Sequence, residues 1–173
     1  MQINAQAFIC VNSNSSAVNV PLYPAINTFA SAMPLEALYQ SLILEHCKNP
    51  RNFGTLEGAS VRRRHEDPAC GDHIELYVAT SADGGIREIK FESWGCALSR
   101  ASASMMTLSV QQQSRARVLE IMAAFHTLFI PPHTRVESLG ELNAFAGVSE
   151  FPARIACALL PWSALAESLR GSA

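Results

Sequence analysis

The sequence is short of charge and has no long apolar run. Charged residues make up 16% of the 173 residues, and 13 Lys and Arg against 15 Asp and Glu give a formal net charge of -2. This balance leaves no basic surface of the kind that binds nucleic acid. No apolar run approaches the roughly 20 residues that span a bilayer. We therefore expect a soluble, cytoplasmic protein with no nucleic-acid or membrane partner.

The first 32 residues contain no Lys, Arg, Asp or Glu. They are rich in Asn, Ser and Ala, include Pro21 and Pro24, and show no regular apolar pattern. A segment of this composition has little to bury and gains little from ordering. We expect residues 1–32 to be a disordered N-terminal extension. Residues 33–173 are expected to form one domain, since a chain that is 49% apolar has enough material for one core.

The number of cysteines is odd, so they cannot all pair in disulfides within one chain. The chain has five cysteines and no secretion signal, so a disulfide framework is not predicted. Metal binding or thiol chemistry is the better interpretation. The five are Cys10, Cys47, Cys70, Cys96 and Cys157.

The pattern from Pro34 onward predicts strands followed by helices. An apolar stripe at helical spacing marks a helix that begins at Pro34 and ends before Asn49. Alternation and turn residues then predict three strands, at roughly Thr55 to His65, Ile74 to Ser81 and Ile86 to Trp94. Helices are predicted at Ala97 to Gln111, Arg115 to Phe129 and, after a loop, from Phe151 onward. This order indicates an α+β domain, with a small three-stranded antiparallel sheet and helices packed on one face.

Two of the cysteines lie where the predicted strands end. Cys70 and Asp72 flank Gly71 in the turn between the first two strands, where a small residue lets the backbone bend. Cys96 follows Gly95, where the third strand becomes a helix. The unpaired N–H groups and the dipole at a helix start favour the thiolate that binds metal.

The third cysteine, Cys157, lies in the last predicted helix. Pro161 cannot donate to the carbonyl of Cys157, so we expect that helix to be kinked or broken there. We expect the apolar face of the helix to carry Phe151, Ile155, Ala158, Leu159, Trp162, Leu165 and Leu169.

Three thiolates and a carboxylate suit a tetrahedral Zn²⁺ site, although the same ligands could hold iron and sulfide. Their excess negative charge calls for a cationic neighbour. Arg154, one turn before Cys157, is the candidate for this cationic neighbour. Asp72 is a harder and more weakly held ligand than a thiolate and shares its turn with Cys70, so we expect this corner of the site to open most easily.

Several independent motifs follow one another along the chain from about Leu35 to Leu169. They are Tyr39-Gln40-Ser41-Leu42-Ile43-Leu44-Glu45-His46, Asn49-Pro50-Arg51-Asn52-Phe53-Gly54, Pro68-Ala69-Cys70-Gly71-Asp72, Gly95-Cys96-Ala97-Leu98-Ser99, Ala101-Ser102-Ala103-Ser104-Met105-Met106-Thr107 and Phe151-Pro152-Ala153-Arg154-Ile155. By these motifs and their order, the chain resembles the IscU/NifU family of iron-sulfur cluster assembly proteins.

Two details resemble the SufU branch of that family. The scaffold branch has a His directly before its third cysteine, whereas this chain has Ala156, and the region from His126 to Asn143 resembles an insertion of the SufU branch. SufU proteins usually have a basic residue at the position of Ala156, so the chain also departs from its own branch there.

The resemblance to SufU implies zinc held by Cys70, Asp72, Cys96 and Cys157. It further implies a zinc-dependent sulfurtransferase that accepts sulfur from a cysteine desulfurase of the SufS type and passes it to a downstream iron-sulfur assembly scaffold. By that analogy Cys70 is the sulfur acceptor, released when a His of the desulfurase replaces it on zinc.

Two other functions stay open. The chain could be a scaffold that assembles a [2Fe-2S] cluster, or binds iron, on the same ligands, because zinc and iron-sulfur clusters both accept thiolates. It could also be a zinc-stabilised interaction module without transfer chemistry, in which Cys70 is only structural.

Two further groups of residues are weaker candidates for metal binding. His73 should point to the opposite face of its strand from Asp72, and the adjacent His46 and Cys47 are distant in sequence from the other thiols.

Overall fold

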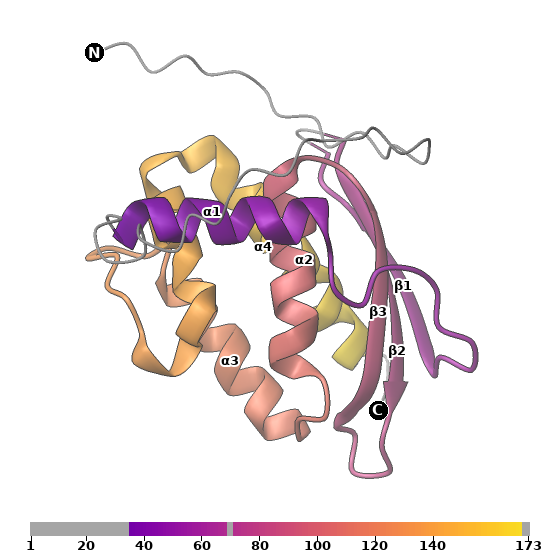
Figure 1. Ribbon diagram of the computed structural model, residues 1–173. Helices are drawn as coiled ribbons and strands as arrows, with labels where there is room; N and C mark the ends of the chain where they lie inside the picture. Colours follow the sequence, from indigo (N-terminus) through magenta and orange to yellow (C-terminus); the bar gives the residue numbers. More distant parts are fainter. Residues whose placement is uncertain (1–34, 69–70, 171–173) are drawn as a thin grey trace, which may run out of the picture.

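The computed structural model describes residues 35–68 and 71–170 (Figure 1). The expected N-terminal extension and the candidate ligand Cys70 lie outside the described residues. No helix among those that are described is long and apolar enough to cross a membrane. In chain order the elements are α1 (Leu35–Lys48), β1 (Val61–Glu66), β2 (His73–Thr80), β3 (Ile86–Trp94), α2 (Ala97–Val110), α3 (Arg115–Thr127), the 3-10 helix η1 (Glu137–Glu150) and α4 (Pro152–Arg170).

The three strands form one antiparallel sheet in the order β1-β2-β3. In the register of β2 and β3, Leu76 lies opposite Phe91 and Val78 opposite Ile89, and all four side chains are buried. The alternate positions, such as Glu75 and its partner Glu92, point away from this core. Such alternation is what a sheet with one covered face requires, and the predicted fold class is confirmed.

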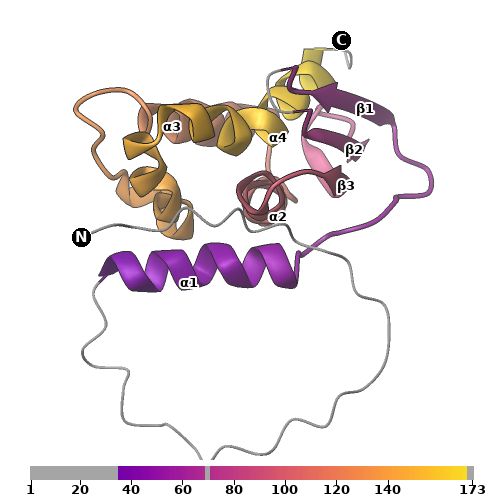
Figure 2. The ribbon, with the colours of Figure 1, turned by 90° about the horizontal axis from the view of Figure 1, so that it is seen from above.

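The helices cover that buried face in layers (Figure 2). Helix α4 packs on β1 and β2, α2 packs on β3 and on α4, and α1 lies along the far side of α2. Small residues along α2 allow this close approach on several sides. Those that are fully or almost fully buried are Ser99, Ala101, Ser102, Ala103 and Ser104.

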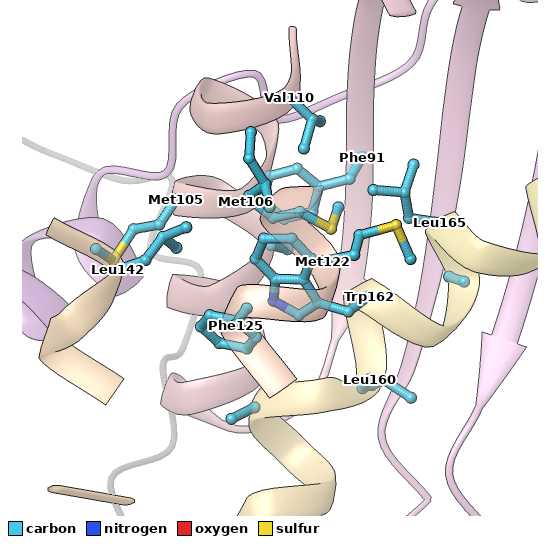
Figure 3. Close-up of a cluster of buried hydrophobic side chains, with 14 of the residues drawn as sticks. Phe91, Met105, Met106, Val110, Met122, Phe125, Leu142, Leu160, Trp162 and Leu165 are labelled. Carbon is cyan, nitrogen blue, oxygen red and sulfur yellow. The ribbon is translucent and has the colours of Figure 1, made fainter. Parts of the chain in front are cut away.

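A cluster of large side chains fills the space between the helices and the sheet (Figure 3). Trp162 of α4 stacks on Phe125 of α3 with ring centroids 4.4 Å apart, and neither side chain is exposed. Phe125 also contacts Phe145 of η1 in an edge-on arrangement. Aromatic pairs of this kind add to the free energy gained from burial itself, so this cluster fixes the positions of α3, η1 and α4.

The segment after α1 ties that helix to β3 and α2. The backbone of Asn52 and Gly54 exchanges two hydrogen bonds with Phe91 on β3, at 3.0 and 2.7 Å. Ser104 of α2 accepts the backbone N–H of Arg51 at 2.8 Å and lies 2.8 Å from Nδ1 of the buried His46. The predicted first helix therefore reaches the core through its C-terminal end.

Three expectations about the elements were wrong in detail. The first strand begins at Val61 rather than near Thr55, because Gly58 adopts a positive φ of 71° that only a turn accommodates. The loop expected before the last helix contains η1, which buries Leu142 and Phe145. Phe151 precedes α4 and is 60% exposed, so it does not belong to the apolar face. Of the kink or break expected at Pro161, the break does not occur, because α4 runs continuously from Pro152 to Arg170.

Candidate metal centre

Three of the four predicted ligands meet at one point of the fold. Asp72, Cys96 and Cys157 each offer one ligand atom, and these atoms all lie within 4.8 Å of one another. They come from the turn before β2, the start of α2 and the second turn of α4. Among the residues that the structure describes, this is the group of His, Cys, Asp or Glu side chains that could hold a metal ion.

The spacing and chemistry of this group fit a dication. Two thiolates bound at about 2.3 Å to one tetrahedral zinc lie about 3.8 Å apart, so separations up to 4.8 Å close with small side-chain rotations. Sulfur and carboxylate ligands suit Zn²⁺, and thiolates also bind iron-sulfur clusters. The three residues therefore form an incomplete tetrahedral set. Cys70, two residues before Asp72 in the chain, would be the fourth ligand, but it lies outside the described residues.

The turn that carries Asp72 is closed by its own backbone. Asp67 donates its N–H to the carbonyl of Asp72 at 2.9 Å, and Gly71 donates to the carbonyl of Asp67 at 2.8 Å. Gly71 has a φ of 74°, in the left-handed region, although a side chain there would meet no neighbouring atom. Glycine is favoured at this position by the backbone conformation and not by lack of space.

Helix α2 begins beside this turn, and Asp72 supplies its cap. Cys96 is the N-cap residue of α2 and makes no side-chain cap of its own. Instead its backbone N–H donates to Oδ2 of Asp72 at 2.9 Å. The hydroxyl of Ser99, in the first turn of α2, lies 3.1 Å from the same oxygen and 3.0 Å from the carbonyl oxygen of Cys96. A carboxylate at a helix start is stabilised by the unpaired N–H groups and by the dipole.

Cys157 is buried, and hydrogen bonds between α4 and α2 fix the helix turn that carries it. It is 2% exposed in α4, whereas Cys96 is partly exposed. The next residue, Ala158, accepts a hydrogen bond of 2.6 Å at its carbonyl oxygen from the hydroxyl of Ser102 on α2. Ser102 in turn accepts the indole N–H of Trp162 at 3.1 Å. The helix turn that carries Cys157 is thus fastened to the helix that follows Cys96.

Arg154, Ala156 and His73, which were also considered from the sequence, are not part of the metal-binding group. Arg154, the predicted cationic neighbour, stands exposed in the first turn of α4, three residues before Cys157. Ala156 is also exposed. His73 stacks on Trp94, with ring centroids 4.8 Å apart, at the ends of β2 and β3, and it is not in the metal-binding group.

The pair His46 and Cys47 belongs to the core. Cys47 is 1% exposed and packs with the apolar cluster. Burial lowers the pKa of His46, and the charge of Arg51 lowers it further. Because Ser104 already accepts the N–H of Arg51, its hydroxyl hydrogen can be donated to Nδ1 of a neutral His46. His46 therefore acts as a buried hydrogen-bond partner of α2.

A second polar cluster lies on the open face of the sheet. The hydroxyl of Tyr77 lies 2.8 Å from Glu92 and 3.2 Å from Glu75, and Glu75 pairs with Arg62 at 2.5 Å. Burial and the two carboxylates raise the pKa of Tyr77 to about 12. The phenol therefore stays protonated and separates two like charges on facing strands, which is a structural role.

Sequence reasoning missed the role of Ser99. Its hydroxyl meets a carboxylate 27 residues earlier in the chain, and this proximity follows only from how β2, β3 and α2 are arranged. The available signal was weak: a serine three residues after a cysteine at a strand-to-helix junction. Such a serine is usually a helix-start residue that bonds its own backbone.

Comparison with known proteins gives consistent matches. The family model described as NifU-like N terminal domain matches residues 38–158. The zinc-dependent sulfurtransferase SufU of Bacillus subtilis (strain 168) is 39% identical over 132 residues, which cover 76% of this chain and 88% of that protein. The iron-sulfur cluster assembly scaffold protein IscU of Streptococcus pyogenes serotype M1 is 36% identical over 140 residues, covering 80% of this chain and 87% of that protein.

A solved structure has the same fold. It is the crystal structure of a candidate iron-sulfur cluster assembly scaffold protein for the SUF system from the thermophile Fervidobacterium islandicum AW-1. It superposes with a TM-score of 0.71 and 29% sequence identity, covering 79% of this chain and 99% of that one.

Proposed function

The chain belongs to the NifU-like N-terminal domain family, and on that premise we propose that it is a zinc-bound sulfur acceptor in iron-sulfur cluster biogenesis. The observation that carries the proposal is the convergence of Asp72, Cys96 and Cys157 within 4.8 Å. The likeness to the Bacillus subtilis protein named a zinc-dependent sulfurtransferase supports the choice of metal and of reaction class.

The ligands in this proposal are Cys70, Asp72, Cys96 and Cys157. Bound zinc would supply positive charge that keeps the cysteine sulfurs deprotonated. Arg154, exposed at the start of α4, would offset part of the remaining negative charge from the solvent side. Asp72 and Cys96 are fixed to each other by a hydrogen bond, and Cys157 is fixed to the core through its helix.

Cys70 is the proposed acceptor. Its thiolate attacks the outer sulfur of a persulfide carried by a cysteine desulfurase. A new S–S bond forms on Cys70, the S–S bond on the desulfurase breaks, and the electron pair leaves with the desulfurase cysteine as a thiolate. The exchange balances without an added oxidant or reductant. We propose a desulfurase of the SufS type as the donor, a downstream iron-sulfur assembly scaffold as the receiver, and the cytoplasm as the place of the reaction.

One alternative has its own support. The relative from Streptococcus pyogenes is named an iron-sulfur cluster assembly scaffold protein, and the same three ligands would accept iron. In that case the chain would hold a [2Fe-2S] cluster or iron and would assemble the cluster rather than relay sulfur. The exposed Ala156, which offers no further ligand directly before Cys157, favours the sulfur relay over this alternative.

The metal content of the purified protein and its effect on a cysteine desulfurase decide between the two. We expect about one zinc per chain and a strong increase in desulfurase turnover when the protein is added. The matched control is Asp72→Ala, which removes one ligand from the described group and should weaken both results. A coloured, labile iron species with little effect on turnover would reject the sulfur relay and support the scaffold.

A further inference from the structure

We propose that Ser99 is a positioning residue that, together with the backbone N–H of Cys96, holds Asp72 as a preset metal ligand. The inference rests on the proposed function, because it concerns how the chain presents one of the four ligands. It concerns Oδ2 of Asp72, the oxygen that the two donors reach at 2.9 and 3.1 Å. The other oxygen, Oδ1, accepts from neither of these donors and would be the ligand atom.

The two donors to Asp72, the hydroxyl of Ser99 and the N–H of Cys96, belong to the start of α2. Ser99 is 2% exposed, and the amide of Cys96 is the first donor of a helix. A carboxylate bonded to both is fixed in orientation before any ion arrives, so less side-chain entropy is lost when the metal binds. The hydroxyl of Ser99 also lies 3.0 Å from the carbonyl oxygen of Cys96, which confines it to the arc between that carbonyl and Asp72.

Gly95 closes the pocket in which the carboxylate sits. A Cβ at this position would lie 2.7 Å from Cγ of Asp72, 2.8 Å from Oδ2 and 2.8 Å from the hydroxyl oxygen of Ser99. Gly95 does not have a positive φ, so the requirement for glycine is one of space. Any side chain at this position has to displace the carboxylate of Asp72 or the hydroxyl of Ser99, which disturbs the contact between them.

This arrangement changes which of the two ligands in this corner, Asp72 or Cys70, is expected to leave the metal. Asp72 was expected from the sequence to be a weakly held ligand. Instead it has two hydrogen bonds and a close-packed neighbour that hold it whether or not a metal is bound. Asp72 is therefore a fixed ligand, and exchange at this corner of the site falls to the thiolate of Cys70.

The test is the zinc affinity of Ser99→Ala, measured by competition with a chromophoric chelator on the full chain. Removal of a hydrogen-bond partner behind a ligand typically costs about 10- to 100-fold in metal affinity, and we expect a loss in that range. Ser109→Ala is the matched control, because Ser109 lies on the same helix and its hydroxyl bonds only the carbonyl of Met105 at 2.9 Å. Ser99→Thr, which keeps the hydroxyl, should recover most of the affinity.

A spectrum separates positioning from general destabilisation. With Co²⁺ in place of zinc, the visible absorption of Ser99→Ala should differ from that of the wild type, because a carboxylate in a new orientation changes the ligand field. Ser109→Ala should keep the wild-type spectrum. Should Ser99→Ala fold poorly, Gly95→Ala tests the same contact from the other side and should lose affinity in the same way.

The outcomes separate the two proposals. Zinc affinity of Ser99→Ala within about twofold of the wild type, with an unchanged Co²⁺ spectrum, would overturn the role of Ser99, since that loss is far below what removal of such a partner costs. A wild-type protein that binds no zinc would overturn the proposed function and this inference with it. In that case the failure is visible in the wild type before any variant is compared.

Discussion

Trp162 donates its indole N–H to the hydroxyl of Ser102 at 3.1 Å, and this bond joins α4 to α2 inside the core. Neither side chain is exposed. The same hydroxyl donates to the carbonyl of Ala158, the residue after Cys157. Because α2 starts directly after Cys96, the bond fixes the distance between the two helices that bring cysteines to the metal-binding group.

Ser102→Ala should destabilise the fold. The change leaves the buried indole N–H of Trp162 without its acceptor, and an unsatisfied buried donor costs about 1–3 kcal/mol. Urea unfolding of the metal-free protein measures the loss directly. The control is again Ser109→Ala, whose partly buried hydroxyl bonds a carbonyl of its own helix. Equal stability of the two variants would show that the Trp162 bond contributes little.

Removal of the metal should lower the melting temperature. The group that would bind it draws on the turn before β2, the start of α2 and the second turn of α4, so an ion bound there favours the folded chain over the unfolded one. Calorimetry before and after chelation measures the shift, and renewed addition of zinc should reverse it. An unchanged melting curve after verified metal removal would mean that the site is not coupled to folding.

His46 should make stability depend on pH. Burial lowers its pKa in the folded state below the unperturbed value of 6.5. Between these two values the unfolded chain binds more protons than the folded one. The contribution of His46 to the free energy of unfolding is therefore fully present above about pH 6.5. It is lost as the pH falls from about 6.5 toward the lowered pKa of His46 in the folded state.

His46→Asn isolates this contribution, because an amide oxygen can accept from Ser104 but does not titrate. Urea unfolding of the metal-free proteins at about pH 8 and about pH 5.5 should show a smaller loss in the variant than in the wild type. Burial also lowers the pKa of His126, but that group contributes equally to both proteins. The same pH dependence in both would exclude His46 as its source.

A chain that begins at Met33 should keep its zinc and nearly all of its stability. This prediction rests on the sequence alone, since residues 1–32 carry no Lys, Arg, Asp or Glu and no apolar periodicity. Zinc content and the melting temperature of the shortened and full-length chains provide the comparison. A substantial fall in melting temperature would show that the N-terminal segment contributes to the folded domain.

The sheet and most helices could be predicted because their patterns are local. Alternation along β2 and β3 and the stripe that includes Trp162 and Leu165 follow from backbone geometry alone. The 3-10 helix η1 could not be predicted, because glycine is unfavourable inside a helix and Gly140 interrupts the helical backbone there with a φ of 51°. The exposure of Phe151 depends on where α4 begins, which the stripe does not fix.

The candidate ligands could be proposed from residue type and position, but the contacts that hold Asp72 in place could not. Asp72 and Cys96 stand at the ends of predicted elements and Cys157 lies in the last predicted helix, and the fold brings the three together. The hydrogen bond from Ser99 and the close approach of Gly95 arise from contacts between distant segments. No local pattern encodes these contacts, so they could not be predicted from the sequence.

Variants of the three cysteines separate the proposed acceptor role of Cys70 from metal binding by Cys96 and Cys157. Cys70→Ser should abolish sulfur acceptance and retain part of the metal. Cys96→Ser and Cys157→Ser should mainly lose metal and stability, because these two thiols belong to the group that joins α2 and α4 to the turn before β2.

The most direct measurement is mass spectrometry of the zinc-loaded protein after incubation with a cysteine desulfurase and cysteine. Digestion without reductant preserves the S–S bond and assigns the added sulfur to one peptide. We expect one added sulfur on the peptide that contains Cys70, and none on that peptide in Cys70→Ser. An added sulfur on Cys157 with none on Cys70 would exclude Cys70 as the acceptor and place the scaffold function first.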